Sequence, residues 1–179
     1  MSRYRTVLTC GDFGPWVSKL ILELPCEVPG QPIGADLLNV YVRVISAKTG
    51  DVRTRHGEPV EGYLAYGDAY VCDERGMRSS CGSRIALELS ECPLTMRIEG
   101  SIQESLQMVP TFRVTQLRPL AAAEGAPIQG LVFDEQDGEL APALAGWSFS
   151  EGVFAGERMA YAVFTPDFDA IRAAEKVPN

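Results

Sequence analysis

Apolar and polar residues alternate one by one along most of the chain from residue 16 onward. The stretch WVSKLILELP sets three leucines on one face and two charged residues on the other, namely Leu20, Leu22 and Leu24 against Lys19 and Glu23. A period of two residues is the spacing of a β-strand with one face in the core and one in water. This stretch is therefore predicted to be the first core strand, and the preceding GDFG is predicted to be the turn that opens it.

The stretch LLNVYVRVI repeats the alternation, and its inward positions are Leu38, Val40, Val42 and Val44. Two strands that each have one wet face favour an antiparallel sheet. Between them, PCEVPGQPIGAD has three prolines and two glycines. That composition excludes a helix and predicts a bent crossing segment.

The segment DAYVCDERGMRSSCGSRIALELS predicts a hairpin, with strands at 69–72 and 84–89 around a turn at 73–76. Gly76 is available for a positive φ in that turn. The second strand turns Ile85, Leu87 and Leu89 inward.

The rest of the chain is predicted to contain further strands joined by longer connections. Strands are expected in FRVTQL (112–117), GLVFDE (130–135), LAGWSFSEG and MAYAVFTP, with a long loop at 92–110, a small-residue and proline linker at 120–127 and an acidic turn DEQDGE. Only ADLL and DAIRAAEK suggest a helix, and each is a turn or two long. Roughly seven to nine short strands, with turn signals about every 8 to 12 residues, are typical of an immunoglobulin-like β-sandwich.

The chain is therefore predicted to be all-β. Residues 1–120 are expected to form an immunoglobulin-like antiparallel β-sandwich, and residues 121–179 a linker and a C-terminal extension of short strands. A length of 179 residues suits one domain with such an extension, since single domains most often hold roughly 100 to 200 residues.

The charge balance excludes nucleic acid as a partner. Sixteen Lys and Arg against 24 Asp and Glu give a net charge of −8, which repels a polyanion. Arg53, Arg55 and His56 lie together in a polar segment, which is interpreted as a solvated loop rather than a phosphate clamp.

The N-terminus MSRYRTVLTCG lacks the apolar run of a secretory leader, and no apolar stretch approaches the roughly 18 residues that cross a bilayer. A cytoplasmic chain with no membrane partner is expected, or a secreted one if a leader was removed. The five cysteines include no C-x-x-C pair, so no metal site is predicted. Cys72 and Cys81 flank the predicted hairpin turn, but in a reducing cytoplasm free buried thiols are favoured over a disulfide.

The candidates for catalysis are weak. The only histidine, His56, sits in TRHGEP with no strand-to-helix nucleophile turn to meet it, so a surface loop position is favoured over a triad. The closest approach to a G-x-S-x-G elbow, Gly146 to Ser150, lacks the final glycine, and Trp147 and Phe149 are interpreted as packing residues. No catalytic residue is predicted.

Ligand motifs are weak as well, so no cofactor or metal site is predicted. Four carboxylates cluster beside a glycine in what is interpreted as a solvated turn rather than a Ca²⁺ loop, namely Asp134, Glu135, Asp137 and Glu139. GDFG lacks the Lys and hydroxyl of a phosphate loop. The aromatic residues either fill the edges of a sandwich, which is favoured, or form a sugar-binding platform, and they are Trp16, Tyr41, Tyr63, Tyr66, Tyr70 and Trp147.

Four segments carry a family resemblance. GDFGPWVSKLILELP, ADLLNVYV, DAYVCDERGMRSSCGSRIALEL and FRVTQLRPL, in this order over about residues 6–120, resemble the N-terminal immunoglobulin-like domain that precedes the catalytic domain in a group of bacterial α/β-hydrolase esterases and peptidases. The tail MAYAVFTPDFDAIRAAEKVPN is similar to the approach to that catalytic domain, with Tyr161 and Pro166 in matching places. The stretch MRIEGSIQESLQM lacks the aromatic, asparagine-rich character expected there.

The resemblance implies a non-catalytic accessory domain of an esterase-type α/β-hydrolase, with the nucleophile elbow, oxyanion loop and triad histidine lying beyond Asn179. Such a domain would pack against the hydrolase domain or a second copy, shaping substrate access or oligomerisation. The alternative is a stand-alone β-sandwich module that binds carbohydrate or protein. A small enzyme that uses Asp134 or Asp137 is the least favoured reading.

Overall fold

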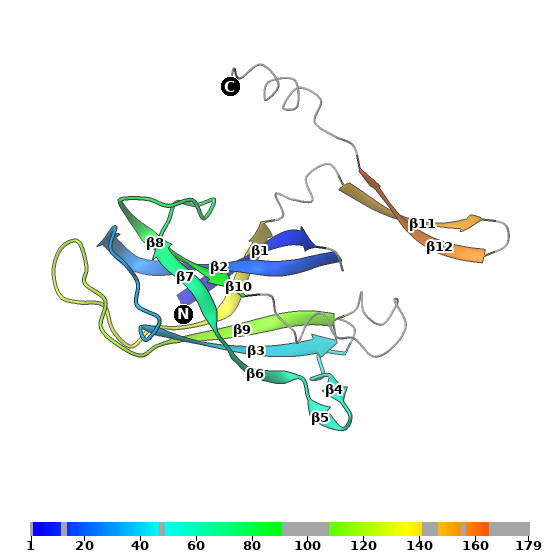
Figure 1. Cartoon of the computed structure of the whole chain (residues 1–179), viewed down its shortest axis with the longest axis horizontal. Coiled ribbons are helices and arrows are strands. Elements are labelled where there is room, and N and C mark those ends of the chain that lie inside the picture. Colours follow the sequence, from blue (N-terminus) through cyan, green and yellow to red (C-terminus); the bar gives the residue numbers. More distant parts are fainter. Residues whose placement is uncertain are drawn as a thin grey trace, which may run out of the picture. The chain divides into compact units, whose positions relative to one another are not determined.

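The regular structure consists of β-strands, and none of the described residues is helical (Figure 1). The computed structural model describes residues 2–11, 14–46, 49–90, 108–140, 147–154 and 157–164. The strands are β1 (Ser2–Gly11), β2 (Gly14–Pro29), β3 (Leu38–Ser46), β4 (Thr54–Arg55), β5 (Glu58–Pro59), β6 (Glu61–Leu64), β7 (Tyr66–Val71), β8 (Cys81–Leu89), β9 (Met108–Gln116), β10 (Val132–Leu140), β11 (Trp147–Phe154) and β12 (Glu157–Phe164). The all-β prediction is confirmed.

The chain divides into two compact units, Met1–Ala141 and Pro142–Asn179. The second unit contains the antiparallel pair β11 and β12, whose register runs from Trp147 opposite Phe164 to Phe154 opposite Glu157. The first unit contains β1 to β10, so β10 belongs with the strands that precede it.

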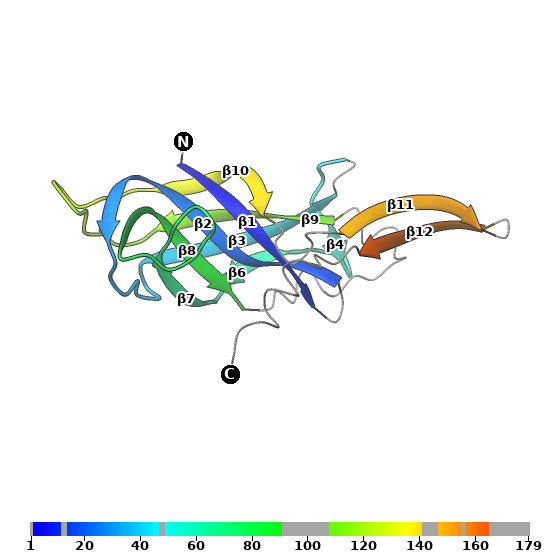
Figure 2. The ribbon, with the colours of Figure 1, turned by 90° about the horizontal axis from the view of Figure 1, so that it is seen from above.

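Eight strands of the first unit form one sheet in the order β6-β3-β9-β10-β1-β2-β8-β7 (Figures 1 and 2). β1 and β10 run parallel, whereas every other neighbouring pair in this sheet is antiparallel. The sheet is therefore mixed, which corrects the expectation of a purely antiparallel one. Its ends are close in sequence, because only Ala65 separates the edge strand β6 from the edge strand β7.

The sheet is nearly closed around one hydrophobic core. Seven of the eight strands contribute buried side chains to the same cluster, and Leu64 on β6 packs against it. The cluster includes Tyr4 on β1, Leu22 on β2, Val40 on β3, Leu87 on β8 and Phe133 on β10. Figures 1 and 2 show β2 and β8 lying over β3 and β9. A single inner face shared by every strand explains why the alternating pattern recurs along the chain.

The strands predicted from alternation are present. On β3 the buried positions alternate with more exposed ones, as expected for Leu38, Val40, Val42 and Val44. Leu20 and Leu22 on β2 and Ile85, Leu87 and Leu89 on β8 are buried as well. Leu24 is partly buried and packs against the same core.

The outer face of β2 is also covered, which alternation does not predict. Ile21 is fully buried in a second cluster with Val7, Tyr70, Cys72 and Ala86. The connection that follows β7 folds over this face. Gly76, at φ +76°, packs so closely that a Cβ atom there would lie 3.0 Å from Ile21 Cδ1.

Three expectations are corrected by the structure. The acidic stretch DEQDGE forms most of β10 instead of a turn. Residues 120–127 are not a simple linker, because buried Leu120 bridges to buried Ile128. The N-terminal stretch forms β1, a strand that was not anticipated. Most of the expected loop at 92–110 and the suggested helix in DAIRAAEK lie outside the described residues.

Candidate functional site

The candidate catalytic residues lie on different elements, with His56 in the first unit and Ser148 and Ser150 in the second. His56 is exposed in the turn between β4 and β5, where His56 and Gly57 both have positive φ, at 50° and 85°. That pair of angles is the signature of a type I′ hairpin turn. Ser148 and Ser150 lie within β11, opposite Val163 and Tyr161 of β12. Their backbone is therefore a paired strand, which differs from the sharp strand-to-helix turn of a nucleophile elbow.

The acidic cluster is spread along β10, where Arg3 on the neighbouring β1 compensates part of its charge. Arg3 approaches Glu135 and Asp137, in each case at 3.6 Å. Among the described residues, no three His, Cys, Asp or Glu side chains come together as a metal site. No helix in the same residues is long and apolar enough to cross a membrane.

The aromatic candidates lie on different parts of the fold. Tyr41 on β3 and Tyr63 on β6 form an edge-to-face pair with ring centroids 5.1 Å apart, and Tyr63 is 72% exposed. Tyr66 donates its hydroxyl hydrogen to Gly34 O, and Tyr70 is buried. Trp16 is partly buried on β2. The side chain of Trp147 lies outside the described residues.

The two ends of the GDFG stretch belong to paired strands. Gly11 on β1 pairs with Gly14 on β2, and residues 12 and 13 lie outside the described residues. The strand that follows, β2, is a core strand, as expected.

The described cysteines are free thiols in different environments. Cys72 is buried, and this burial raises its pKa to about 11. Cys26 and Cys81 are exposed, which differs from the expectation of buried thiols. Cys81 donates to Glu27 at 3.4 Å, and this hydrogen bond raises the pKa of the thiol. Cys72 and Cys81 therefore stay largely protonated near neutral pH.

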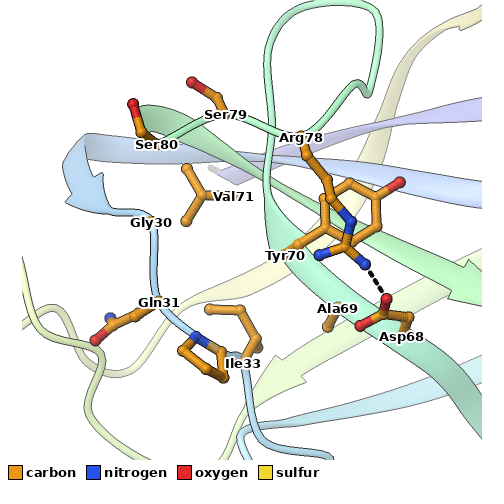
Figure 3. A pocket seen from close by; sticks show the side chains of 11 residues that line it. Gly30, Gln31, Ile33, Asp68, Ala69, Tyr70, Val71, Arg78, Ser79 and Ser80 are labelled. Carbon is orange, nitrogen blue, oxygen red and sulfur yellow. Dashed lines mark hydrogen bonds and ion pairs between the residues drawn. The ribbon is translucent and has the colours of Figure 1, made fainter.

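A cavity of about 410 Å³ lies between β7 and the segment that follows β2 (Figure 3). Three short stretches line it, at 30–33, 68–71 and 78–80. Ile33, Ala69 and Val71 supply the buried apolar part of the lining, whereas the exposed Asp68, Arg78 and Ser80 supply the polar part. This volume falls within the range of small-ligand pockets.

Arg78 is held at the mouth of the cavity by two contacts. Its guanidinium carbon lies 4.0 Å from the centroid of the Tyr70 ring, and its Nη2 pairs with the carboxylate of Asp68. Figure 3 shows the guanidinium stacked beside the ring, with the ion pair to Asp68 drawn as a dashed line. Stacking and pairing together fix the plane of the guanidinium, which leaves its other N–H donors for a ligand.

Tyr70 is fixed from its other end by a polar cluster on the outer face of the sheet. Lys19 Nζ donates to Tyr70 Oη at 2.7 Å, and Tyr70 Oη donates to Glu88 Oε1 at 2.9 Å. Lys19 Nζ also donates to Gly76 O at 3.2 Å. Burial is the main cause of the raised pKa of Tyr70, so the phenol is protonated at neutral pH. The cluster orients the ring on which Arg78 stacks.

The sequence reasoning did not single out the Asp68, Arg78 and Lys19 side chains of this site. The sequence predicts the hairpin that contains Asp68 and Arg78, but the stacking of Arg78 over Tyr70 depends on how the connection folds back across β2. The only local signal was a charged residue near an aromatic strand residue, Asp68 before Tyr70, and such a pattern is common on protein surfaces.

Comparisons with known proteins find similarity to a solved structure but to no sequence family. No family model matches the chain, and no curated protein matches it. The fold is similar to a solved structure described as a thermostable esterase, with a TM-score of 0.67 and 19% sequence identity. The match covers 92% of this chain and 43% of that chain, so this chain spans less than half the length of the esterase. At this identity the match shows the fold alone.

Proposed function

We propose that the chain is a non-catalytic, immunoglobulin-like accessory domain of an esterase-type α/β-hydrolase. The observation that carries the proposal is the structural match, which covers nearly all of this chain and only 43% of the esterase. The four segments from GDFGP to FRVTQL support it, because they resemble, in the same order, segments of such accessory domains. The domain would pack against a hydrolase domain or a second copy and shape access to the substrate.

The placement of the candidate nucleophiles is consistent with this role. His56 lies in the β4–β5 turn, whereas Ser148 and Ser150 are paired strand residues of the second unit. The pKa of about 11 for Cys72 keeps that thiol protonated and therefore a poor nucleophile at neutral pH.

An ester-hydrolysis assay tests the absence of catalysis. The purified chain is incubated with p-nitrophenyl butyrate next to the variants Ser148→Ala and Ser150→Ala. We expect the three proteins to release p-nitrophenol at the rate of buffer alone. Hydrolysis by the parent chain that a single serine substitution abolishes would overturn the proposal.

The gene provides a second test. We expect the DNA that follows the codon for Asn179, or an adjacent gene, to encode an α/β-hydrolase domain with an H-G oxyanion motif. Co-purification of that product with this chain, measured by light scattering after size exclusion, supports the accessory role. The proposal is contradicted if no hydrolase gene lies near this gene and no hydrolase co-purifies with this chain.

A second candidate function, carbohydrate binding by a stand-alone module, has one observation in its favour. Tyr63 presents an exposed ring beside Tyr41, and Arg43 pairs with Glu61 at 2.7 Å on the same strands. Aromatic faces flanked by polar groups are suited to sugar rings. A glycan array on which the parent chain binds and Tyr63→Ala does not would favour this function. Equal signals from both proteins would exclude the tyrosine pair as the binding site.

A further inference from the structure

One edge of β7 faces the cavity instead of another strand. β7 is the last strand in the sheet order, and only β8 pairs with it. Cys72 N donates to Arg84 O of β8 at 3.0 Å. Because main-chain groups alternate between the two edges of a strand, residues 70 and 72 bond to β8, and residues 69 and 71 point to the other edge. The hydrogen bond from Ser79 N to Val71 O, at 3.0 Å, lies on that other edge.

Three main-chain groups lie on this edge, and no strand among the described residues pairs with it. They are the N–H and C=O of Ala69 and the N–H of Val71, by the same alternation. The two residues are buried, with 5% and 2% of their surfaces exposed. A strand edge that pairs with no other strand and lines a cavity is the geometry that an added strand fits.

The opposite wall of the cavity is fixed at both ends. Gly30 N donates to Ser80 O at 2.7 Å, and the Tyr66 hydroxyl donates to Gly34 O at 3.1 Å. Between these two hydrogen bonds the segment runs beside β7 without pairing with it. The result is a slot, lined by residues 30–33 on one side and residues 68–71 on the other (Figure 3).

We propose that this slot binds an extended peptide segment as an added strand on β7. A donor, an acceptor and a second donor along a strand edge match the main chain of a peptide. Residues 68–71 span about 13 Å at roughly 3.3 Å per residue, which is the length of about four residues of the ligand. Arg78 adds a cation at the mouth, so an acidic residue at that end of the peptide gains a charge-assisted hydrogen bond. The inference goes beyond the accessory role, because it needs no hydrolase.

Amide exchange and chemical shifts, measured by NMR on the full chain, test the proposal. The probe is acetyl-Thr-Val-Thr-Val-Asp-amide, and its control is the same peptide with both valine nitrogens methylated. In the free protein, we expect the Ala69 and Val71 amides to exchange at least about tenfold faster than that of Cys72, which is bonded to β8. The probe should slow both amides and shift their resonances, whereas the methylated peptide should not.

Other outcomes overturn the proposal. One is an absence of shifts at Ala69 and Val71 at about 5 mM probe, a concentration that detects millimolar affinity. Another is equal binding of the methylated peptide, because main-chain pairing would then not be the mode of recognition. A third is a set of shifts confined to residues away from the slot.

A matched pair of variants tests the role of Arg78. Arg78→Ala should weaken the binding of the probe about tenfold, whereas Arg113→Ala, an exposed arginine on β9 that does not line the slot, should leave it unchanged. Replacing the aspartate of the probe with asparagine should weaken binding to the parent protein but not to Arg78→Ala. Equal losses in both proteins would show that Arg78 does not contact this carboxylate.

Discussion

The side chain of Tyr4 provides the hydrogen-bond partner of a main-chain N–H group on β9. Its hydroxyl accepts a hydrogen bond from Phe112 N at 3.0 Å, and the two rings meet edge to face with centroids 6.1 Å apart. β10 pairs with β9 only at Val114 and Thr115, so no strand covers this N–H. The pKa of the hydroxyl is raised by burial, and the neutral phenol therefore forms part of the core.

Tyr4→Phe should lower the free energy of unfolding by about 1–3 kcal/mol, because the buried N–H of Phe112 would lose its partner. Urea denaturation followed by circular dichroism measures the loss. The control is Tyr63→Phe, whose ring is 72% exposed, and we expect a change of less than about 0.5 kcal/mol there. Equal effects in the two variants would show that the hydrogen bond adds nothing to burial.

Asp73 organises the connection that follows β7. Its Oδ1 accepts hydrogen bonds from Arg75 N and Met77 N, each at 2.9 Å. The bond from Met77 N is the largest cause of the lowered pKa of this carboxyl. Because the pKa is lower in the folded state, the charge stabilises the fold above the unfolded pKa, and this contribution is lost as the pH falls through the folded pKa.

Asp73→Asn should lower the melting temperature at pH 7, and the difference from the parent chain should shrink as the pH falls below the ordinary aspartate value of 3.8. Thermal denaturation at a series of pH values measures both effects. Glu74→Gln is the matched control, and we expect no pH-dependent difference for it. A difference for Asp73→Asn that stays constant down to pH 2.5 would argue against the charge as its source.

At the scale of elements, the connection between β7 and β8 covers the outer face of β2. Gly76 is the point of closest approach, because a Cβ there would lie 3.0 Å from Ile21 Cδ1 and 3.3 Å from Lys19 Cδ. Its φ of +76° is in the left-handed region, which glycine adopts without steric cost. Glycine at this position is therefore required for both its backbone angle and its small size.

Gly76→Ala should lower the free energy of unfolding by about 2 kcal/mol or more, since the left-handed angle alone costs an alanine about 1–2 kcal/mol. Gly125→Ala separates the two causes, because Gly125 has φ +86° with nothing within 4 Å of an added Cβ. We expect only the backbone cost there. Equal losses of unfolding free energy in the two variants would mean that the Ile21 side chain moves aside at little cost.

The strands differ in how much of them the sequence predicts. β3 follows strict alternation because one face of it meets the core. The inward positions of β3 and β8 were predictable, although Ala86 on the outer face of β8 is buried as well. The start of β10 was predicted to be a strand, whereas residues 134–139 were interpreted as a turn because they are acidic and contain Gly138. Its charges are tolerated because its side chains other than Phe133 are at least partly exposed, and because Arg3 lies on the neighbouring strand. That neighbour is distant in sequence, so no local pattern could reveal it.

At the scale of the whole molecule, one core unites the eight-stranded sheet. Leu22 on β2 and Leu38 on β3 belong to the same buried cluster although their strands are not neighbours in the sheet. The all-β class was predictable from alternation alone. The near closure of the sheet and the β7 slot were not, because both depend on which strands meet at the edges.

Leu22→Ala and Leu38→Ala should each lower the free energy of unfolding by about 2–5 kcal/mol, because each leaves a cavity in the same core. Both should shift a single cooperative transition in urea. Leu117→Ala is the matched control, since Leu117 is 57% exposed, and we expect less than about 1 kcal/mol there. Two separate transitions in either core variant would contradict a shared core.

The direct connection of β6 to β7 through Ala65 affects how the protein avoids aggregation. Free sheet edges attract strands of other chains, and most open sheets have two separate edges to protect. Here the two edge strands, β6 and β7, are joined at Ala65, so the residues around it lie next to both edges. The irregular pairing between Tyr66 and Ala69 and the charge of Asp68 lie just beyond that point. Irregular pairing and charge hinder indiscriminate strand addition. Substitutions at 65–68 should therefore influence solubility more than equally exposed changes elsewhere on the sheet.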